Sequence, residues 1–312
     1  MSQDRSITSE LGFLARHAMY KTVKPYSLRF TPPESLPRQN LEIEKKEVTI
    51  HDARSLNPTL DVHGFTLTRI PTRMRYEDFR DHDKIETVYA NELQSHLKNL
   101  LQAPHVRVID YVVRRRHPEF PISTGEDYES QQPAALIHLD FSHDEAIHML
   151  KTLCGDSAYE IMRHRWQLIN LWRPLRGPVF DWPLAICDAR TFDQDRDAQA
   201  ADAVYPEWAY ENVLVHHHPD QRWYYFHGME ESETMLFKCT DGDKLAVGGC
   251  PHGAFPNPWS ESATTSSSMP RESVESRAFV MWAPIDEWPT EVGTLYGPGR
   301  RLRTGSLSSL TH

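Results

Sequence analysis

The first third of the chain mixes two kinds of apolar pattern. Residues 1–60 read as an extended arm punctuated by proline, with one short helix expected over residues 9–21. Residues 46–50 are rich in β-branched side chains and residues 64–70 alternate apolar with polar positions, so both segments predict strands. Apolar residues spaced three and four apart over residues 76–101 predict a helix with one apolar face.

The rest of the chain is dominated by strand patterns. Residues 106–113 form a β-rich run, and residues 144–166 predict a second helical region with a break near Gly155. Further short strands are expected over residues 168–172, 212–216, 223–226, 235–238 and 277–282. Helices early and many short strands late predict an α+β, mainly β, fold with a jelly-roll core and flanking helices.

We expect one domain over residues 1–296. It would comprise the arm, helical regions at 76–101 and 144–166, and a jelly-roll core over 134–283. The tail at 297–312 is rich in Arg, Gly and Ser and is expected to be flexible. The polar loop at 260–268 is a candidate lid.

Composition narrows the class of protein. A net charge of -10 over 312 residues argues against non-specific nucleic-acid binding, which needs a basic footprint. No apolar run approaches the roughly 20 residues that span a bilayer. The four cysteines lack CxxC spacing, so reduced thiols and a cytoplasmic location are expected.

A metal site is the main chemical candidate. Four His-x-acid pairs occur: His117/Glu119, His138/Asp140, His143/Glu145 and His218/Asp220. Only His138 and Asp140 lie inside a strand-like run, where the period of two puts both side chains on one face. His252, in a small-residue turn, would complete two histidines and one carboxylate, the ligand set of a non-haem Fe(II) oxygenase.

Each of these residues also has an ordinary structural explanation. His138 and Asp140 could belong to a half-buried strand with a hydrogen-bonded histidine, and His252 could be a loop histidine. A metal-dependent hydrolase that uses residues 216–218 is another reading. It is disfavoured because that run would straddle both faces of a strand.

Arginines follow His252 at a spacing that suits the next strand. Arg271, Ser273, Glu275 and Arg277 would share one face of it. A buried arginine needs a carboxylate partner, and a bound dicarboxylate could supply one through a bidentate ion pair. The alternative is a structural pair, such as Arg277 with Glu275 or Glu272. The sequence leaves open which arginine faces the metal.

Several segments, in the same order over residues 10–290, resemble a family of oxygenases. That family includes the gibberellin desaturase, the fungal AsaB-type hydroxylase/desaturases and the small component of the cephamycin methoxylase. The matching segments are residues 52–54, 64–65, 110–114, 135–140, 170–175, 183–185, 222–226, 237–238, 251–255 and 270–277.

The resemblance implies a double-stranded β-helix with Fe(II) as metal and 2-oxoglutarate and O2 as co-substrates. It implies metal ligands at His138, Asp140 and His252. Asn170, Trp172 and Tyr224 are candidates for the co-substrate pocket, with core packing as the alternative for the aromatic residues. The implied activity is hydroxylation, desaturation or oxidative ring closure of a small molecule in fungal specialised metabolism, by a monomer or homodimer. An amino acid or a carboxylated intermediate is the candidate substrate. A non-catalytic partner subunit of another enzyme is the competing hypothesis.

Overall fold

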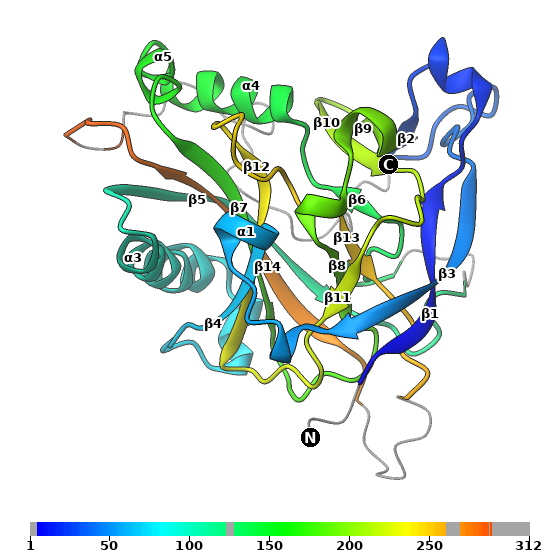
Figure 1. Cartoon of the computed structure of the whole chain (residues 1–312), viewed down its shortest axis with the longest axis horizontal. Helices are drawn as coiled ribbons and strands as arrows, with labels where there is room; N and C mark the ends of the chain where they lie inside the picture. The colour runs from blue at the N-terminus through cyan, green and yellow to red at the C-terminus, as the bar shows by residue number, and fades with distance from the viewer. Residues whose placement is uncertain (1–4, 123–127, 260–268, 287, 289–312) are drawn as a thin grey trace.

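Two curved β-sheets face each other and make up the body of the protein (Figure 1). The computed structural model describes residues 5–122, 128–259, 269–286 and 288. The nine-stranded sheet has the order β1-β3-β11-β8-β13-β6-β10-β9-β2, and the five-stranded sheet has the order β4-β12-β7-β14-β5. Neighbouring strands come from distant parts of the chain, so residues far apart in sequence meet between the sheets.

The elements have the following bounds. The nine-stranded sheet contains β1 (Ile7–Leu14), β2 (Tyr26–Leu28), β3 (Ile43–Asp52), β6 (His138–Leu139), β8 (Leu184–Cys187), β9 (Ala198–Val204), β10 (Ala209–Val215), β11 (Trp223–Tyr225) and β13 (His252–Ala254). The five-stranded sheet contains β4 (Phe65–Arg69), β5 (His105–Arg115), β7 (Trp166–Pro174), β12 (Glu233–Asp241) and β14 (Glu272–Met281). The α-helices are α1 (Leu60–His63), α2 (His82–Lys84), α3 (Ala90–Leu101), α4 (His143–Cys154), α5 (Ser157–Ile161) and α6 (Gln194–Asp197). Shorter helical turns are η1 (Ala18–Lys21), η2 (Ala53–Ser55), η3 (Tyr76–Arg80), the π-helical η4 (Ile85–Tyr89) and η5 (Ala189–Thr191).

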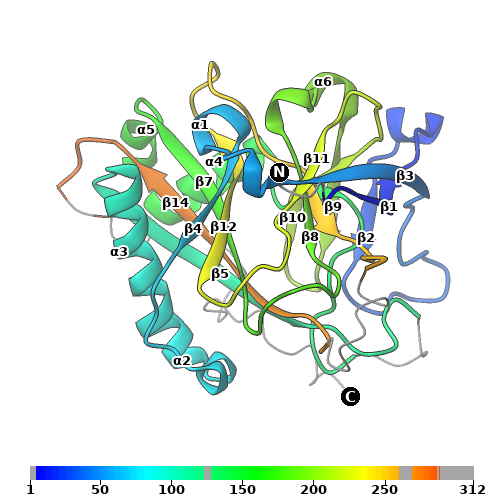
Figure 2. The same cartoon turned by 60° about the horizontal axis from the view of Figure 1, so that its bottom comes forward.

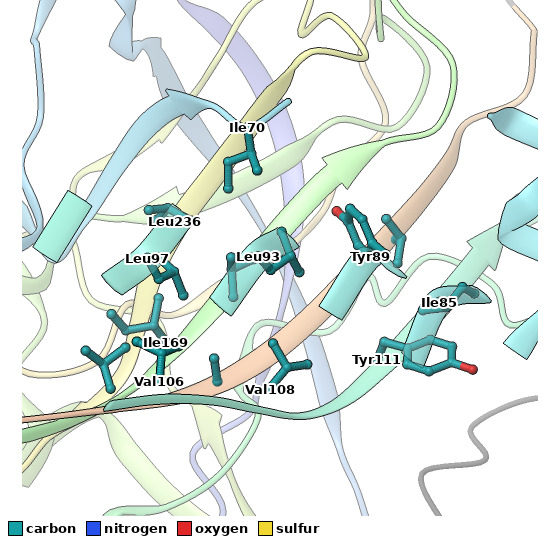
Figure 3. Close-up of a cluster of buried hydrophobic side chains, with 14 of the residues drawn as sticks. Ile70, Ile85, Tyr89, Leu93, Leu97, Val106, Val108, Tyr111, Ile169 and Leu236 are labelled. Atoms are coloured by element: carbon teal, nitrogen blue, oxygen red, sulfur yellow. The ribbon is translucent and has the colours of Figure 1, made fainter. Parts of the chain in front are cut away.

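Helix α3 covers the outer face of the five-stranded sheet, away from the nine-stranded sheet (Figures 1 and 2). Leu93 and Leu97, four residues apart, share one side of α3 and are fully buried. Figure 3 shows them with Tyr89 facing Ile169 of β7 and Leu236 of β12. This apolar layer anchors the strands that carry inward-pointing polar residues on their other face.

The register of the strand pairs shows which residues lie on the inner face of the five-stranded sheet, the face towards the nine-stranded sheet. Along β14 the direct cross-strand partners on β5 are Ser273↔Arg114, Glu275↔Val112 and Arg277↔Asp110. On β7 the partners are Glu275↔Trp172 and Arg277↔Asn170. Direct partners in an antiparallel pair lie on one face, and side chains two residues apart do too. The odd-numbered positions of β14 from 273 to 277 therefore point, with these partners, towards the nine-stranded sheet.

The helix predicted at residues 9–21 is wrong over most of its length. Residues Ile7–Leu14 form β1, which pairs antiparallel with β3, and only Ala18–Lys21 is helical. Along β1, buried positions alternate with exposed ones from Ile7 to Leu11, a period of two rather than 3.6. Pairing along an existing sheet overrode the local helical preference.

Other predicted elements are largely confirmed, with changed limits. The expected helix over 76–101 is helical but divided among η3, α2, η4 and α3. The break near Gly155 is confirmed: Gly155 ends α4 with a φ of 52°. Ordered strand pairing at β6 is only two residues long, so Asp140 follows the strand directly rather than lying within it.

Some expectations fall on residues that the structure does not describe. The candidate lid at 260–268 and the tail at 297–312 both lie outside the described residues. The four cysteines are free and buried. Among the described residues, no helix is both long and apolar enough to cross a membrane.

Candidate metal centre

Two neighbouring strands of the nine-stranded sheet bring His138, Asp140 and His252 together. β13 pairs with β6 so that His252 is the direct partner of His138, and Asp140 lies just beyond β6. One donor atom from each of the three residues lies within 4.8 Å of the other two. His138 Nε2 is 3.4 Å from an Asp140 carboxylate oxygen, and the two imidazole rings are 4.5 Å apart between centroids.

A close backbone approach positions His252. A Cβ atom at Gly249 would lie 2.1 Å from the Cys239 carbonyl oxygen of β12. Only glycine therefore allows the chain to pass this closely beside β12 before it enters β13. The His252 ring then packs on Phe237, with centroids 4.6 Å apart.

Backbone carbonyls orient both imidazoles in the same way. His138 Nδ1 is 2.7 Å from the Leu136 carbonyl oxygen, and His252 Nδ1 is 3.2 Å from the Cys250 carbonyl oxygen. A carbonyl oxygen can only accept, so in each ring Nδ1 carries the proton and donates it. The lone pair of each Nε2 is then available for a metal, the arrangement usual for ligating histidines.

Charge and burial together determine the ionisation of Asp140, the third candidate ligand. Burial alone would raise the pKa of Asp140, but the Arg277 guanidinium nearby helps to hold that pKa well below its usual range. An Arg277 nitrogen is 3.7 Å from one Asp140 oxygen, and the Asn170 amide donates a hydrogen bond to the same oxygen. Asp140 is thus an oriented carboxylate, the form that binds a metal.

The donor set fits a divalent cation of the first transition series. His252 Nε2 is buried and has no hydrogen-bond partner among the residues that the structure describes. Burial, together with the charge of His138, lowers the pKa of His252 to about 3. A buried imidazole nitrogen with no partner normally costs free energy, and a metal would remove that cost. Two neutral imidazoles and one carboxylate form the ligand set of non-haem Fe(II) sites.

Within the part of the chain that the structure describes, the Arg271 guanidinium is buried without an ion-pair partner. Its side chain donates to the Ser273 hydroxyl at 3.4 Å and to the Trp182 carbonyl oxygen at 2.7 Å. The guanidinium also lies 5.0 Å from the centroid of the Trp172 ring. Burial, and secondarily the charge of Arg114, lower the pKa of Arg271 to about 9. Among the described residues no carboxylate oxygen lies within 4.0 Å of its guanidinium nitrogens, so its charge is not balanced by an ion pair there.

Arg277, within β14, differs from Arg271, which directly precedes that strand. Its Nε donates to Asp110 at 2.5 Å, in an ion pair with little exposure to solvent. The structural partners considered for it, Glu275 and Glu272, are therefore wrong: Glu272 pairs with Arg115 instead. Asp110 lies 167 positions earlier in the chain, and no local pattern links the two.

Glu275 is a site residue that the sequence did not identify as such. One of its oxygens is 3.8 Å from His252 Nε2 and accepts a 2.9 Å hydrogen bond from Asn170. Burial, reinforced by the negative charge of Asp140, raises the pKa of Glu275. The Asn170 amide thus links Glu275 to Asp140, one of the three candidate metal ligands. Strand parity had placed Glu275 on the inner face, but only the fold shows what it faces.

Other predicted residues lie at different distances from this centre. Trp172 lines the inner face under Arg271, as its parity with Asn170 requires. Tyr224 of β11 is the cross-strand partner of Ile186, which separates it from His252, and it packs against Phe65. Among the described residues, the histidine run that begins at His216 forms no metal-ligand cluster, and His216 Nδ1 bonds to the Leu14 carbonyl oxygen.

Comparison with known proteins identifies the family. A family model described as "Oxidoreductase/YMDC permease-like domain" matches residues 11–281. The Fe(II)/2-oxoglutarate-dependent dioxygenase nvfI of Aspergillus novofumigatus is 28% identical over 288 residues, which are 87% of this chain and 95% of that protein. Hydroxylase/desaturase CTB9 of Cercospora beticola is 29% identical over 79% of both chains.

A solved structure of a related enzyme is also similar to this protein. That of the iron and alpha-ketoglutarate-dependent endoperoxidase NvfI superimposes with a TM-score of 0.75 at 26% identity, over 89% of this chain and 98% of that one. This match confirms the expected jelly-roll fold. It also agrees with the resemblance to fungal hydroxylase/desaturases. Because the family model covers most of the sequence, this chain belongs to that oxidoreductase family, together with Fe(II)/2-oxoglutarate-dependent oxygenases of fungal specialised metabolism.

Proposed function

We propose that this chain, a non-haem Fe(II)/2-oxoglutarate-dependent oxygenase, holds iron through His138, Asp140 and His252 and its co-substrate through Arg271. The observation that carries the proposal is the pairing of two unfilled positions. Over the described ranges, His252 Nε2 is buried without a hydrogen-bond partner, and the Arg271 guanidinium is buried without a carboxylate beside it. An Fe(II) ion and a dicarboxylate would complete both.

When bound, Fe(II) and 2-oxoglutarate supply the activation of O2 and the oxidation of a C–H bond. The chain's own residues position these groups. Trp172 and Ser273 hold the Arg271 guanidinium in place, one by stacking and the other by a hydrogen bond. A planar guanidinium so held can meet a carboxylate through two parallel hydrogen bonds.

A second group of residues would keep the metal ligands oriented. Asn170 donates to Asp140 and to Glu275, and Arg277 balances the charge of Asp140 while paired with Asp110. Apolar rings surround this polar cluster: Phe237 packs on His252, and the Arg277 guanidinium lies 4.9 Å from the Phe141 ring centroid. Such surroundings restrict water and strengthen each electrostatic contact.

An anaerobic titration tests the proposed ligands. Fe(II) and 2-oxoglutarate added together to the wild-type protein should produce a weak metal-to-ligand absorption band in the visible range. His252→Ala should lose the band because it removes an iron ligand, while the fold, followed by circular dichroism, is kept. His216→Ala is the matched control, since it removes a buried histidine away from the cluster. A full band in His252→Ala would contradict the assignment.

The substrate and setting are further parts of the proposal. We expect a small molecule, oxidised by hydroxylation, desaturation or ring closure, and a single oxygenase domain that works in the cytoplasm as a monomer or homodimer. The relatives compared above are named as oxygenases or hydroxylase/desaturases, which favours an enzyme over a non-catalytic subunit. Succinate release against amino acids, terpenoid acids and polyketides, with product mass spectra, would identify the reaction: one added oxygen means hydroxylation, and two lost hydrogens mean desaturation or ring closure.

A further inference from the structure

The inner face of the five-stranded sheet carries a third arginine, Arg114, that the metal centre and the co-substrate do not use. Arg114 is the direct cross-strand partner of Ser273, so its side chain is on the same face as Ser273 and Glu275. A strand rises about 3.3 Å per residue, so Arg114 is about 7 Å along β5 from Val112, the partner of Glu275. An arginine side chain can cover that distance.

A short segment between the sheets holds the Arg114 guanidinium. Its Nη1 donates to the Gln132 carbonyl oxygen at 2.8 Å, and Gln131 forms a β-bridge with Arg114. Two residues further on, the Ala134 carbonyl oxygen accepts from the amide of Ala254 in β13. This segment therefore connects β5 of one sheet with β13 of the other, the strand that carries His252. The Arg114 guanidinium contacts the segment at Gln132. Arg114 is half-buried, so it is accessible from solvent, in contrast to Arg271.

The Arg114 guanidinium donates to a backbone carbonyl oxygen and, in the described part of the chain, pairs with no carboxylate. Among the described residues, no acidic oxygen lies within 4.0 Å of its guanidinium, whereas Arg277 has Asp110 and the neighbouring Arg115 has Glu272. Its charge nevertheless acts on the site, because it contributes to lowering the pKa of Arg271. Two arginines that disfavour each other's charge beside a metal centre are stabilised when anions bind there.

We propose that Arg114 binds a carboxylate of the organic substrate and thereby sets the enzyme's preference for carboxylic acids. The inference rests on the proposed function, in which one carboxylate of 2-oxoglutarate binds the metal and the other binds Arg271. That assignment leaves no co-substrate group for Arg114. A substrate anchored through one carboxylate would have its apolar part between the two sheets, next to the iron ligands. The guanidinium fork suits a planar carboxylate, and one such charge-assisted pair accounts for at least a tenfold preference.

Binding measurements on the anaerobic Fe(II)–2-oxoglutarate form test this role. The probes are hexanoate, decanoate and cyclohexanecarboxylate, each compared with its primary amide by titration calorimetry. We expect the wild-type protein to bind at least one acid tenfold more tightly than its amide. Arg114→Gln should abolish that preference while the dissociation constant of 2-oxoglutarate stays within about threefold. Arg114→Lys, which keeps the charge but not the fork, should retain part of the preference.

Arg222→Gln is the matched control, because it removes one exposed positive charge elsewhere on the surface and should leave the preference unchanged. Three results would overturn the proposal: no acid preferred by the wild type, a preference that persists in Arg114→Gln, or a loss of 2-oxoglutarate affinity in that variant. The last would assign Arg114 to the co-substrate. Failure of the proposed function is distinguishable, since the visible band with Fe(II) and 2-oxoglutarate would then be absent from the wild type.

Discussion

The two faces of the five-stranded sheet are both buried but differ in chemistry. The outer face is an apolar layer in which Leu93 and Leu97 of α3 pack against Ile169 and Leu236 (Figure 3). The inner face, made by the alternate residues of the same strands, carries arginines, carboxylates and an amide. Burial of apolar area stabilises the fold, whereas each buried charge costs free energy unless it is paired.

The difference shows where ligands belong. Most inner-face charges are satisfied within the chain, as in the pair of Arg277 with Asp110 and the hydrogen bonds of Asn170. Among the described residues, His252 Nε2 has no hydrogen-bond partner. Arg271 and Arg114 donate to neutral oxygens there but have no carboxylate within ion-pair distance of their guanidinium groups. A face that must bind ions and a face that must hold the fold should therefore respond differently to substitution.

The largest loss of activity is expected at the metal ligands. Asp140→Ala should reduce 2-oxoglutarate-dependent turnover by more than the roughly 10–100-fold that loss of a supporting residue causes. The physical reason is that the metal loses its only anionic protein ligand. Succinate release measures the effect, and Asp144→Ala on α4 controls for the charge. Activity above a few per cent of wild type would remove Asp140 from the ligand set.

Arg271 should affect the co-substrate more than the metal. Arg271→Gln should raise the KM for 2-oxoglutarate by about 10–100-fold, since charge-assisted hydrogen bonds contribute about 1.5–3 kcal/mol. Fe(II) affinity, measured by competition with a chelator, should change little. Arg115→Gln, on the opposite face, is the control. An unchanged KM in Arg271→Gln would assign the co-substrate to another arginine.

Asn170 is expected to have a smaller, indirect effect. Asn170→Ala removes the amide that orients Asp140, so Fe(II) affinity should fall about tenfold while the KM for 2-oxoglutarate changes less. Chelator competition distinguishes this from a co-substrate role. If metal affinity were unaffected, the hydrogen bond would only help pack the two carboxyl groups.

A substitution on the outer face should lower the stability of the protein and leave its activity and metal affinity nearly unchanged. Leu97→Ala leaves a cavity beneath α3 and should lower the free energy of unfolding by about 2–5 kcal/mol. Below the unfolding transition, kcat and Fe(II) affinity should stay near the wild-type values. A change in metal affinity as large as that of Asn170→Ala would mean that the two faces are mechanically coupled.

The smallest expected effect is on the pH dependence of stability, and it comes from His216, which lies on neither face of the five-stranded sheet. Burial lowers the pKa of His216, whose Nδ1 bonds to the Leu14 carbonyl oxygen. A histidine whose folded pKa lies below its unfolded value of about 6.5 stabilises the fold above that pH, and this contribution is lost as the pH falls towards the folded pKa. The urea midpoint of the metal-free protein should therefore decline below about pH 6.5. It should decline less steeply in His216→Gln, and an identical slope would exclude His216 as a contributor.

Local pattern was enough to predict many elements and several residues of the candidate site. Strand parity separated His138 and Asp140 from three rival pairs, and it placed Arg271, Ser273, Glu275 and Arg277 on one face. It failed at residues 9–21, where pairing of β1 with β3 decided the conformation. Local pattern also does not show that the Lys238 side chain is fully buried and paired with Asp241 at 2.7 Å.

The sequence by itself determined the donor types, their alternation along each strand and the family to which they belong. Only the tertiary structure decided which arginine has an internal partner, because Asp110 and Arg277 meet through strand register across 167 positions. The same register brought His252 beside His138 and placed Glu275 and Arg114 around them. Periodicity depends on near neighbours in the chain, whereas register depends on how both sheets pack as a whole.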